Sequence, residues 1–219
     1  MFEAVIFDWD GTLADTRAVL VTAFKRALYT IGLVVEDELI ERRIGIGVVA
    51  TFRGILDYKG VSYDDDLIQR MLKIKVETEI SLSTQIRLFT GARELLNSLD
   101  GKITVALASM NQREFIDHAL KEKDLQKFFS VTLTANEVRN PKPDPEIFLK
   151  TALKLGVKPE RCLVVEDSIF GVKAAKTANM SCVAVAQGAY SKEELTSAKP
   201  DLIVGSLLEK NAILNMIFG

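Results

Sequence analysis

The sequence alternates short, wholly apolar runs with longer amphipathic stretches, and this alternation restricts the chain to one class of fold. Strands buried on both faces of a parallel sheet consist of uninterrupted apolar runs, and helical stretches between them cover the two faces. Strand–helix–strand units of this kind connect through right-handed crossovers. We therefore predict an α/β, doubly wound parallel sheet with strands at 3–7, 103–108, 131–134, 162–165, 182–186 and 202–204, and helices at 93–99, 113–121, 145–155, 170–178 and 207–217.

Residues 15–85 interrupt this alternation. Three helical stretches, 16–31, 50–58 and 64–80, follow one another there without an intervening strand. The segment starts directly after the first strand and its turn, where an open α/β sheet has its ligand crevice. We predict a core made of residues 1–14 and 86–219 and an inserted helical cap domain, 15–85, that covers the site.

Charge and cysteine content exclude several classes of function. The 30 acidic and 28 basic residues give a net charge of -2, which provides no general attraction to nucleic acid or anionic lipid. The longest apolar run, 182–186, is far shorter than the roughly 20 residues that cross a bilayer, and the first residues do not resemble a signal peptide. Cys162 and Cys182 match no zinc pattern and are expected to be buried free thiols. We expect a cytoplasmic protein with no nucleic-acid or membrane partner; the oligomeric state stays open.

Pairs of acidic residues follow two of the predicted strands. Asp8 and Asp10 follow the first strand, and Glu166 and Asp167 end the strand that begins at residue 162. Neighbouring parallel strands end at one sheet edge, so the four carboxylates converge and repel one another unless a cation joins them. Helix capping and a glycine turn would account for Asp10 and Asp167, but they do not account for Asp8 and Glu166. Because hard cations take oxygen ligands, the pattern predicts a Mg²⁺ site.

Two further residues suit an anion-binding crevice. Ser109 follows the predicted strand 103–108, and a helix begins soon after Asn111, so a hydroxyl and free backbone N–H groups meet there. Lys142 lies between Pro141 and Pro143, which stiffen its loop. Serine is common in such turns and lysine is common on surfaces. These two residues therefore indicate an anion-binding site only in combination with the acidic residues.

Together these segments resemble the haloacid dehalogenase-type (HAD) hydrolase superfamily, whose members are mostly phosphatases and phosphomutases. Its four motifs are matched in order by 8–13, Ser109, Lys142 and 166–167. Residues 142–148 and 165–172 resemble more narrowly the subgroup that contains β-phosphoglucomutase, phosphoglycolate phosphatase and sugar-phosphate phosphatases. The resemblance implies a Rossmann-like core with a helical cap, and a Mg²⁺-dependent phosphatase acting on a small phosphorylated metabolite, with phosphoglycolate or a sugar phosphate as leading candidates.

The resemblance also implies roles for individual residues. Asp8 would attack phosphorus to form an aspartyl phosphate, and Asp10 would serve as general acid and then as general base. Ser109 and Lys142 are the other implied catalytic residues and would hold the transferring oxygens in the transition state. The remaining implied roles are substrate binding by Gly11, Thr12, Met110 and Asn111, and Mg²⁺ binding by Asp8, the Asp10 carbonyl, Asp167 and the nearby Glu166.

Departures from the family pattern bear on the alternatives. Members of the mutase type have a histidine near the position of Leu20, whereas the single histidine of this chain, His118, falls on a predicted core helix. Asn179 stands where relatives have glycine, and asparagine also tolerates the left-handed end of a helix. In the cap loop 42–48, Arg42 and Arg43 suit either an anionic part of the substrate or a solvated helix end.

Three other functions remain to be compared with the phosphatase. A β-phosphoglucomutase-like phosphomutase is the first, and the missing histidine argues against it. A dehalogenase needs neither Asp10 nor the second acidic pair. A receiver-type phospho-accepting module also combines clustered aspartates, a hydroxyl residue and a lysine, but such modules are shorter and carry no helical insertion.

Overall fold

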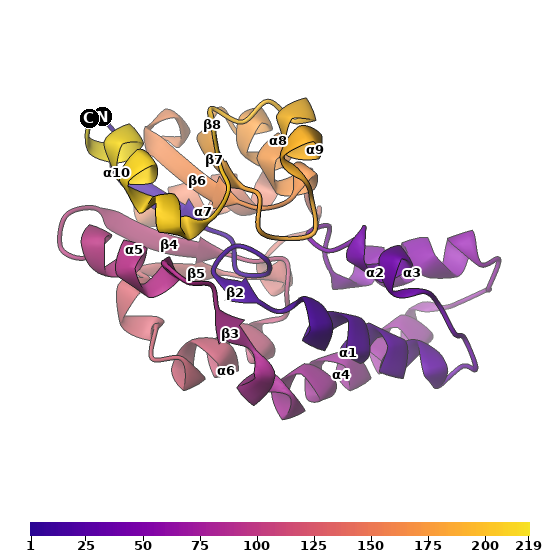
Figure 1. Cartoon of the computed structure of the whole chain (residues 1–219). Coiled ribbons are helices and arrows are strands. Elements are labelled where there is room, and N and C mark those ends of the chain that lie inside the picture. The colour runs from indigo at the N-terminus through magenta and orange to yellow at the C-terminus, as the bar shows by residue number, and fades with distance from the viewer.

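The computed structural model describes residues 1–219 and contains a six-stranded parallel sheet in the order β5-β4-β1-β6-β7-β8. Figure 1 shows this sheet between two layers of helices, with the two chain ends close together. The doubly wound α/β core predicted from the sequence is confirmed. Its strands are β1 (Ala4–Phe7), β4 (Thr104–Ala108), β5 (Val131–Leu133), β6 (Cys162–Glu166), β7 (Ser181–Val185) and β8 (Leu202–Val204).

Each central strand contributes buried residues alternately to the two faces of the sheet. Val5 and Phe7 of β1 belong to one hydrophobic core, and Ala4 and Ile6 belong to the other. Because both faces are covered, these strands need apolar residues at every position, which explains the uninterrupted runs in the sequence. Helices α5 (Ala92–Leu99), α6 (Arg113–Glu122) and α10 (Lys210–Phe218) cover the first face, and α7 (Glu146–Leu155), α8 (Ile169–Thr177) and α9 (Lys192–Ser197) cover the second.

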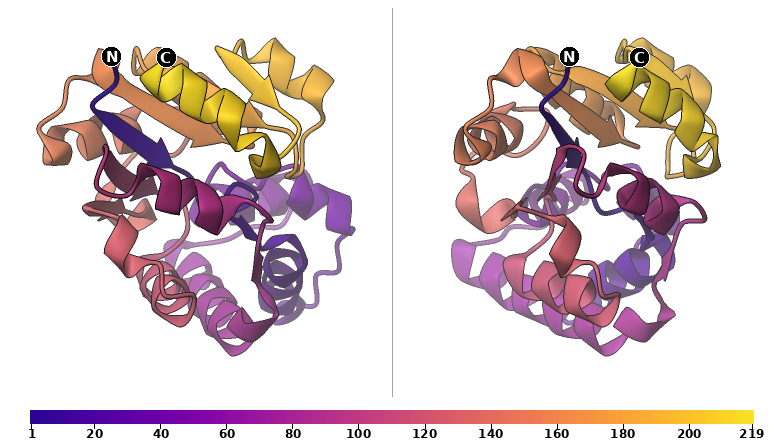
Figure 2. Two further views of the ribbon diagram at one scale, coloured as in Figure 1. Left: turned by 60° about the vertical axis from the view of Figure 1, so that its left-hand side comes forward. Right: turned by 90° about the vertical axis from the view of Figure 1, so that its left-hand side faces the viewer.

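Four helices form a separate layer between two short strands. Strand β2 (Ala14–Asp15) pairs antiparallel with β3 (Arg87–Leu88), so the chain leaves and re-enters the core side by side. Between these strands lie α1 (Arg17–Tyr29), α2 (Asp37–Glu41), α3 (Val48–Tyr58) and α4 (Asp65–Ser81), which share a small hydrophobic core of their own. Figure 2 shows them packed against the same end of the molecule from two further directions. Their position agrees with the expected insertion, while the division at residues 15 and 85 stays a prediction.

The differences from the expected elements are small. Helices α2 and α9 were not expected, because elements of five and six residues carry too little periodicity to detect. Both cysteines are buried free thiols, as expected. None of the helices combines the length and the apolar character that crossing a bilayer requires.

The end of α8 explains the unusual Asn179. This residue adopts a left-handed conformation with φ of 57°, and the next backbone N–H, that of Met180, donates to Ala175 O at 3.0 Å. Such an end closes the last helical turn and normally uses glycine. Asparagine can take this conformation at modest cost because its short polar side chain bonds locally.

We expect Asn179→Ala to lower the free energy of unfolding by about 1 kcal/mol, because a left-handed conformation disfavours a Cβ without local polar compensation. The control Asn179→Gly should change it less, since glycine adopts this conformation freely. Urea denaturation of the two variants measures the difference, and equal destabilisation by both would show that the side chain of Asn179 matters more than its backbone.

Candidate active site

The register of three central strands sets the predicted site residues side by side. Phe7, the last residue of β1, pairs with Leu107 of β4 and Val165 of β6. Asp8, Ser109 and Glu166 therefore follow at the same sheet edge. The chain runs from β1 to β4 and β5 on one side and from β6 to β7 and β8 on the other, so the strand order reverses between β1 and β6. The carboxyl ends of these strands are therefore the topological switch point at which α/β folds bind ligands.

Lys142 connects the acids at the ends of β1 and β6. Its ammonium lies 2.7 Å from Asp8 Oδ1 and 2.6 Å from Glu166 Oε1, and all three side chains are buried. It also lies 4.9 Å from the centre of the Phe148 ring on α7, so an aromatic face covers the charge from the side. The loop lysine that the sequence singled out thus reaches into the centre of the acidic group.

The charges of this group are unbalanced. Three carboxyl groups, those of Asp8, Glu166 and Asp167, surround one ammonium, so full ionisation leaves two negative charges. Burial raises the pKa of Asp8 to about 8 and raises the pKa of Asp167 well above its usual range. Burial disfavours the charged form of Lys142, but the attraction of Asp8 and Glu166 outweighs this and raises its pKa. A divalent cation would compensate the remaining charge.

The turn after β6 holds Glu166 firmly. Glu166 Oε2 accepts hydrogen bonds from the backbone N–H of Asp167 at 2.9 Å and from the backbone N–H of Ser168 at 2.8 Å, and from the Ser168 hydroxyl at 3.0 Å. Ser168 also caps α8, because its side chain accepts from Gly171 N. With Oε1 on Lys142 and Oε2 on this turn, Glu166 positions its neighbours as well as offering charge to a cation.

The residues present fit a magnesium ion. Oxygen atoms of Asp8, Glu166 and Asp167 lie within 4.8 Å of one another, and carboxylate oxygens are the ligands that Mg²⁺ takes. Two glycines let the backbone pass close to this group: a Cβ on Gly11 or Gly188 would lie 2.1 or 1.8 Å from Asp167 Oδ2. Any larger residue at these positions would displace the buried Asp167 carboxylate.

Asp10 lies apart from the acidic group. Its Oδ2 is 3.4 Å from the Asn111 side-chain amide and 3.5 Å from Ser109 Oγ, and its Oδ1 has no hydrogen-bond partner. Burial raises the pKa of this carboxyl. The two aspartates of the first motif therefore have different environments. A role for the Asp10 carbonyl in metal binding stays a prediction.

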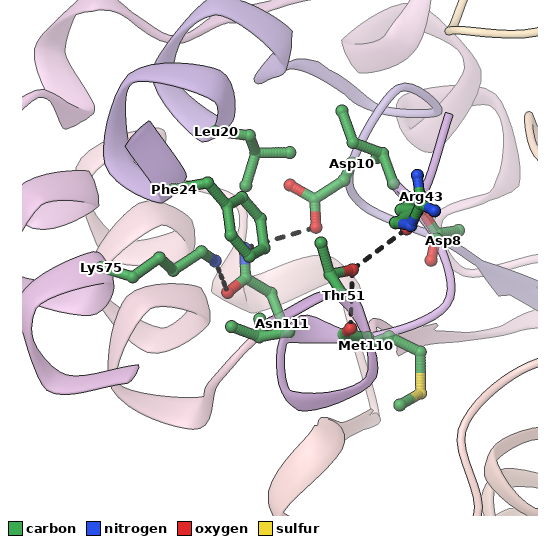
Figure 3. A pocket seen from close by; sticks show the side chains of 13 residues that line it. Asp8, Asp10, Leu20, Phe24, Arg43, Thr51, Lys75, Met110 and Asn111 are labelled. Atoms are coloured by element: carbon green, nitrogen blue, oxygen red, sulfur yellow. Dashed lines mark hydrogen bonds between the residues drawn. The ribbon is translucent and has the colours of Figure 1, made fainter. Parts of the chain in front are cut away.

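A small cavity joins the core residues to the helical layer. It measures about 30 Å³ and is lined by Asp8, Asp10, Met110 and Asn111 from the core, and by Leu20, Phe24, Arg43, Thr51 and Lys75 from the helices. Figure 3 shows Asp10 between the apolar side chains of α1 and the loop that carries Asn111. A larger cavity of about 540 Å³ adjoins it, sharing Gly47, Val48 and Met110.

The cap loop packs closely on the core through its glycines. A Cβ on Gly45 would lie 2.8 Å from Ser168 Oγ, and a Cβ on Gly47 would lie 2.9 Å from Met110 Cε. The two arginines of this loop serve different purposes. Arg42 forms an ion pair with Glu194 and covers the Tyr190 ring, whereas Arg43 lines the small cavity. Of the two arginines, only Arg43 is therefore placed to contact a substrate.

Sequence reasoning missed Lys75 and Glu79 on α4. Both side chains are fully buried, and Lys75 lines the small cavity. A detectable pattern existed: they continue the inward-facing helical series of Ile68 and Met71 at a spacing of four residues. Charged residues at positions where the periodicity demands apolar ones indicate a buried polar cluster.

Comparisons with known proteins found a matching family model, similar proteins and similar solved structures. A family model described as haloacid dehalogenase-like hydrolase matches residues 5–185. A phosphorylated carbohydrates phosphatase of Thermotoga maritima is 35% identical over 180 residues, which cover 81% of this chain and 82% of that protein. A phosphoglycolate phosphatase of Salmonella choleraesuis is 30% identical over 223 residues, covering 92% and 88%. The crystal structure of a hydrolase from Pseudomonas syringae superposes with a TM-score of 0.91 at 28% identity, covering 99% of this chain and 100% of that one.

Gly171 on α8 lets Glu166 take its place, and this gives a test of the site's packing. A Cβ on Gly171 would lie 1.7 Å from Glu166 Oε1, so Gly171→Ala should displace that carboxylate from Lys142. We expect a loss of about 1–3 kcal/mol in the free energy of unfolding, as for overpacked cores. The matched helical control is Gly54→Ala, whose Cβ would meet its nearest neighbour at 3.4 Å. It should be neutral or stabilising by up to about 1 kcal/mol, and a similar gain in Gly171→Ala would contradict this account of Glu166.

Proposed function

Because this chain belongs to the haloacid dehalogenase-like hydrolases and is a phosphatase, we propose that it hydrolyses a small phosphorylated metabolite through an aspartyl phosphate on Asp8, with Mg²⁺ as its cofactor. The observation that carries this proposal is the different surroundings of the two aspartates after β1. Asp8 contacts the ammonium of Lys142 at 2.7 Å, whereas Asp10 contacts only neutral donors and faces the helical layer. Two carboxyl groups in contrasting environments suit the roles of nucleophile and acid–base catalyst.

Burial raises the pKa of Asp8 to about 8, and a bound divalent cation would favour its ionised form. In the first step, a carboxylate oxygen of ionised Asp8 attacks phosphorus, and the bond from phosphorus to the ester oxygen breaks. The leaving oxygen takes the proton of Asp10, whose pKa is raised by burial, and a raised pKa favours the protonated form that a general acid requires. The products of this step are the free alcohol, the aspartyl phosphate and an Asp10 carboxylate.

In the second step, the Asp10 carboxylate removes a proton from water while the water oxygen attacks phosphorus. The bond between Asp8 and phosphorus breaks, inorganic phosphate is formed, and both aspartates return to their starting states. Splitting one difficult displacement into two easier steps is the advantage of a covalent intermediate.

The surrounding groups would stabilise charge on the transferring phosphoryl oxygens. Lys142 is one donor, and Ser109 with the backbone N–H groups after β4 would supply others, because the transition state spreads charge over these oxygens. Mg²⁺ held by Asp8, Asp167 and the Asp10 carbonyl, with Glu166 nearby, would offset the repulsion between an anionic nucleophile and a phosphate dianion.

The cavities bear on the class of substrate. The cavity of about 30 Å³ beside Asp8 and Asp10 is far smaller than a phosphomonoester, so the helical layer would move to admit the substrate. Arg43 would then face the leaving group. Phosphoglycolate or a sugar phosphate suits this lining, since a carboxylate or hydroxyl groups can bind to its guanidinium. Leu20, an apolar residue at the cavity, gives no support to the mutase alternative.

The test of the proposal is phosphate release from a panel of metabolites that includes phosphoglycolate and sugar phosphates. We expect turnover with added Mg²⁺, loss of turnover in excess chelator and recovery when Mg²⁺ is restored. Asp8→Asn should abolish release while the circular dichroism spectrum stays unchanged, because an amide of nearly equal volume is a poor nucleophile. The exposed Asp100→Asn serves as control and should behave like the unchanged protein. Full turnover in chelator, with the metal content measured, would overturn the metal requirement.

Asp10→Asn should separate the two steps. An alkyl alcohol leaves poorly without a proton, so phosphoenzyme formation from an alkyl phosphate should slow by about 10²- to 10⁴-fold. p-Nitrophenolate needs little protonation, so p-nitrophenyl phosphate should still give a burst of one phenolate per site, followed by slow hydrolysis. Rapid-mixing absorbance measurements record this burst. Equal losses toward alkyl and aryl esters in the first step would mean that Asp10 does not act as acid and then base.

A further inference from the structure

A buried ion pair on α4 lies outside the four motifs and bridges the helical layer to the core. Lys75 Nζ is 2.6 Å from Glu79 Oε1 and 2.8 Å from Asn111 Oδ1, and both charged side chains are fully buried. Asn111 belongs to the loop after β4, in the core, and Figure 3 shows Lys75 pointing at it from the neighbouring helix. The contact therefore forms only while α4 lies on this loop.

Stability alone does not explain this pair. Removing two charges from water costs several kcal/mol per ion, and an apolar pair of similar volume usually packs equally well or better. Glu79 also keeps one buried oxygen, Oε2, without a hydrogen-bond partner. The inward face of α4 is otherwise apolar at Ile68 and Met71. A polar pair kept at such a position indicates a task other than packing.

The pair determines which way the Asn111 amide points. Ammonium groups only donate hydrogen bonds, so Lys75 must face the amide oxygen, which also accepts from Gln112 N at 2.8 Å. The amide nitrogen is then left to donate to Glu79 Oε1 at 3.0 Å and to Asp10 Oδ2 at 3.4 Å. A flipped amide would set its oxygen against both carboxylates. Lys75 and Glu79 therefore exclude the flipped orientation.

We propose that Glu79 and Lys75 are positioning residues that act through Asn111, orienting the carboxyl group of Asp10 for proton transfer only when α4 lies on the core. This inference rests on the proposed function, because it assigns to Asp10 the role of proton donor. Leu20 and Phe24 of α1 present only carbon atoms to the cavity. The polar network of the helical layer that reaches Asp10 through Asn111 comes from α4.

The decisive variant is Lys75→Met/Glu79→Met, which replaces both charges by flexible apolar chains and leaves no unpaired buried ion. Single-turnover formation of phosphoenzyme from an alkyl phosphate should slow by about 10-fold or more. This loss should be smaller than the loss caused by Asp10→Asn, because the acid itself is still present. For p-nitrophenyl phosphate, the same step should stay within about 3-fold, because its leaving group needs little protonation. The matched control is Lys73→Met/Glu77→Met, an exposed pair at the same spacing on α4, which should alter neither rate.

A second variant and a measurement without substrate complete the test. Asn111→Leu, nearly equal in size, should show the same selective loss toward the alkyl ester. The NMR signals of the Asn111 side-chain amide should shift in Lys75→Met/Glu79→Met and stay in place in the control pair. Hydrolysis of p-nitrophenyl phosphate by the wild-type protein tests the proposed function before the variants are compared. A failure of the proposed function is therefore distinguished from a failure of the inference about Lys75 and Glu79.

Three results would overturn the inference. Equal losses toward both esters would mean that the pair only supports the cap or binds substrate. If the stable double variant forms phosphoenzyme from the alkyl phosphate at the wild-type rate, the role of the ion pair is structural. An alkyl-to-aryl ratio unchanged in Asn111→Leu would remove Asn111 as the connection to Asp10.

Discussion

The ammonium of Lys142 between Asp8 and Glu166 is the interaction on which the site depends. A parallel sheet brings the ends of β1 and β6 together, and with them acids that repel one another when buried. The Lys142 ammonium, 2.7 Å from Asp8 and 2.6 Å from Glu166, offsets part of the repulsion between these carboxylates. The negative charge that remains when the acids are ionised suits a divalent metal ion. The rigid loop of Lys142 and the tight turn after β6 both serve to hold this contact. Replacing the lysine would therefore affect folding and catalysis together.

Small residues around the acids matter as much as the acids themselves. Gly11 and Gly188 pass close to the Asp167 carboxylate, and Gly171 passes close to Glu166, at separations where a single methyl group would not fit. The site is thus compact because the backbone itself approaches the carboxylates, and its geometry is fixed by packing that a larger residue would destroy.

The helical layer packs on the core beside Asp8 and Asp10. Its loop glycines lie close to Met110 and Ser168, and its buried pair on α4 contacts the loop after β4, so two separate contacts depend on the same packing. This packing leaves a cavity of only about 30 Å³ beside the two aspartates. Movement about the paired strands β2 and β3, where both connections cross, would open it.

The sequence by itself determined the α/β class, eight of the ten helices and all six strands of the main sheet to within a few residues, because burial on both faces of the sheet requires uninterrupted apolar runs and the helices between them are amphipathic. It also identified Asp8, Ser109, Lys142, Glu166 and Asp167, since these follow strand ends or lie in a marked motif. Only the tertiary structure separated Asp10 from the acidic group, distinguished Arg43 from Arg42, and revealed Lys75 and Glu79. Those outcomes depend on contacts between segments distant in the chain, and a lysine on a helix has the same local pattern whether its partner is water or a buried amide.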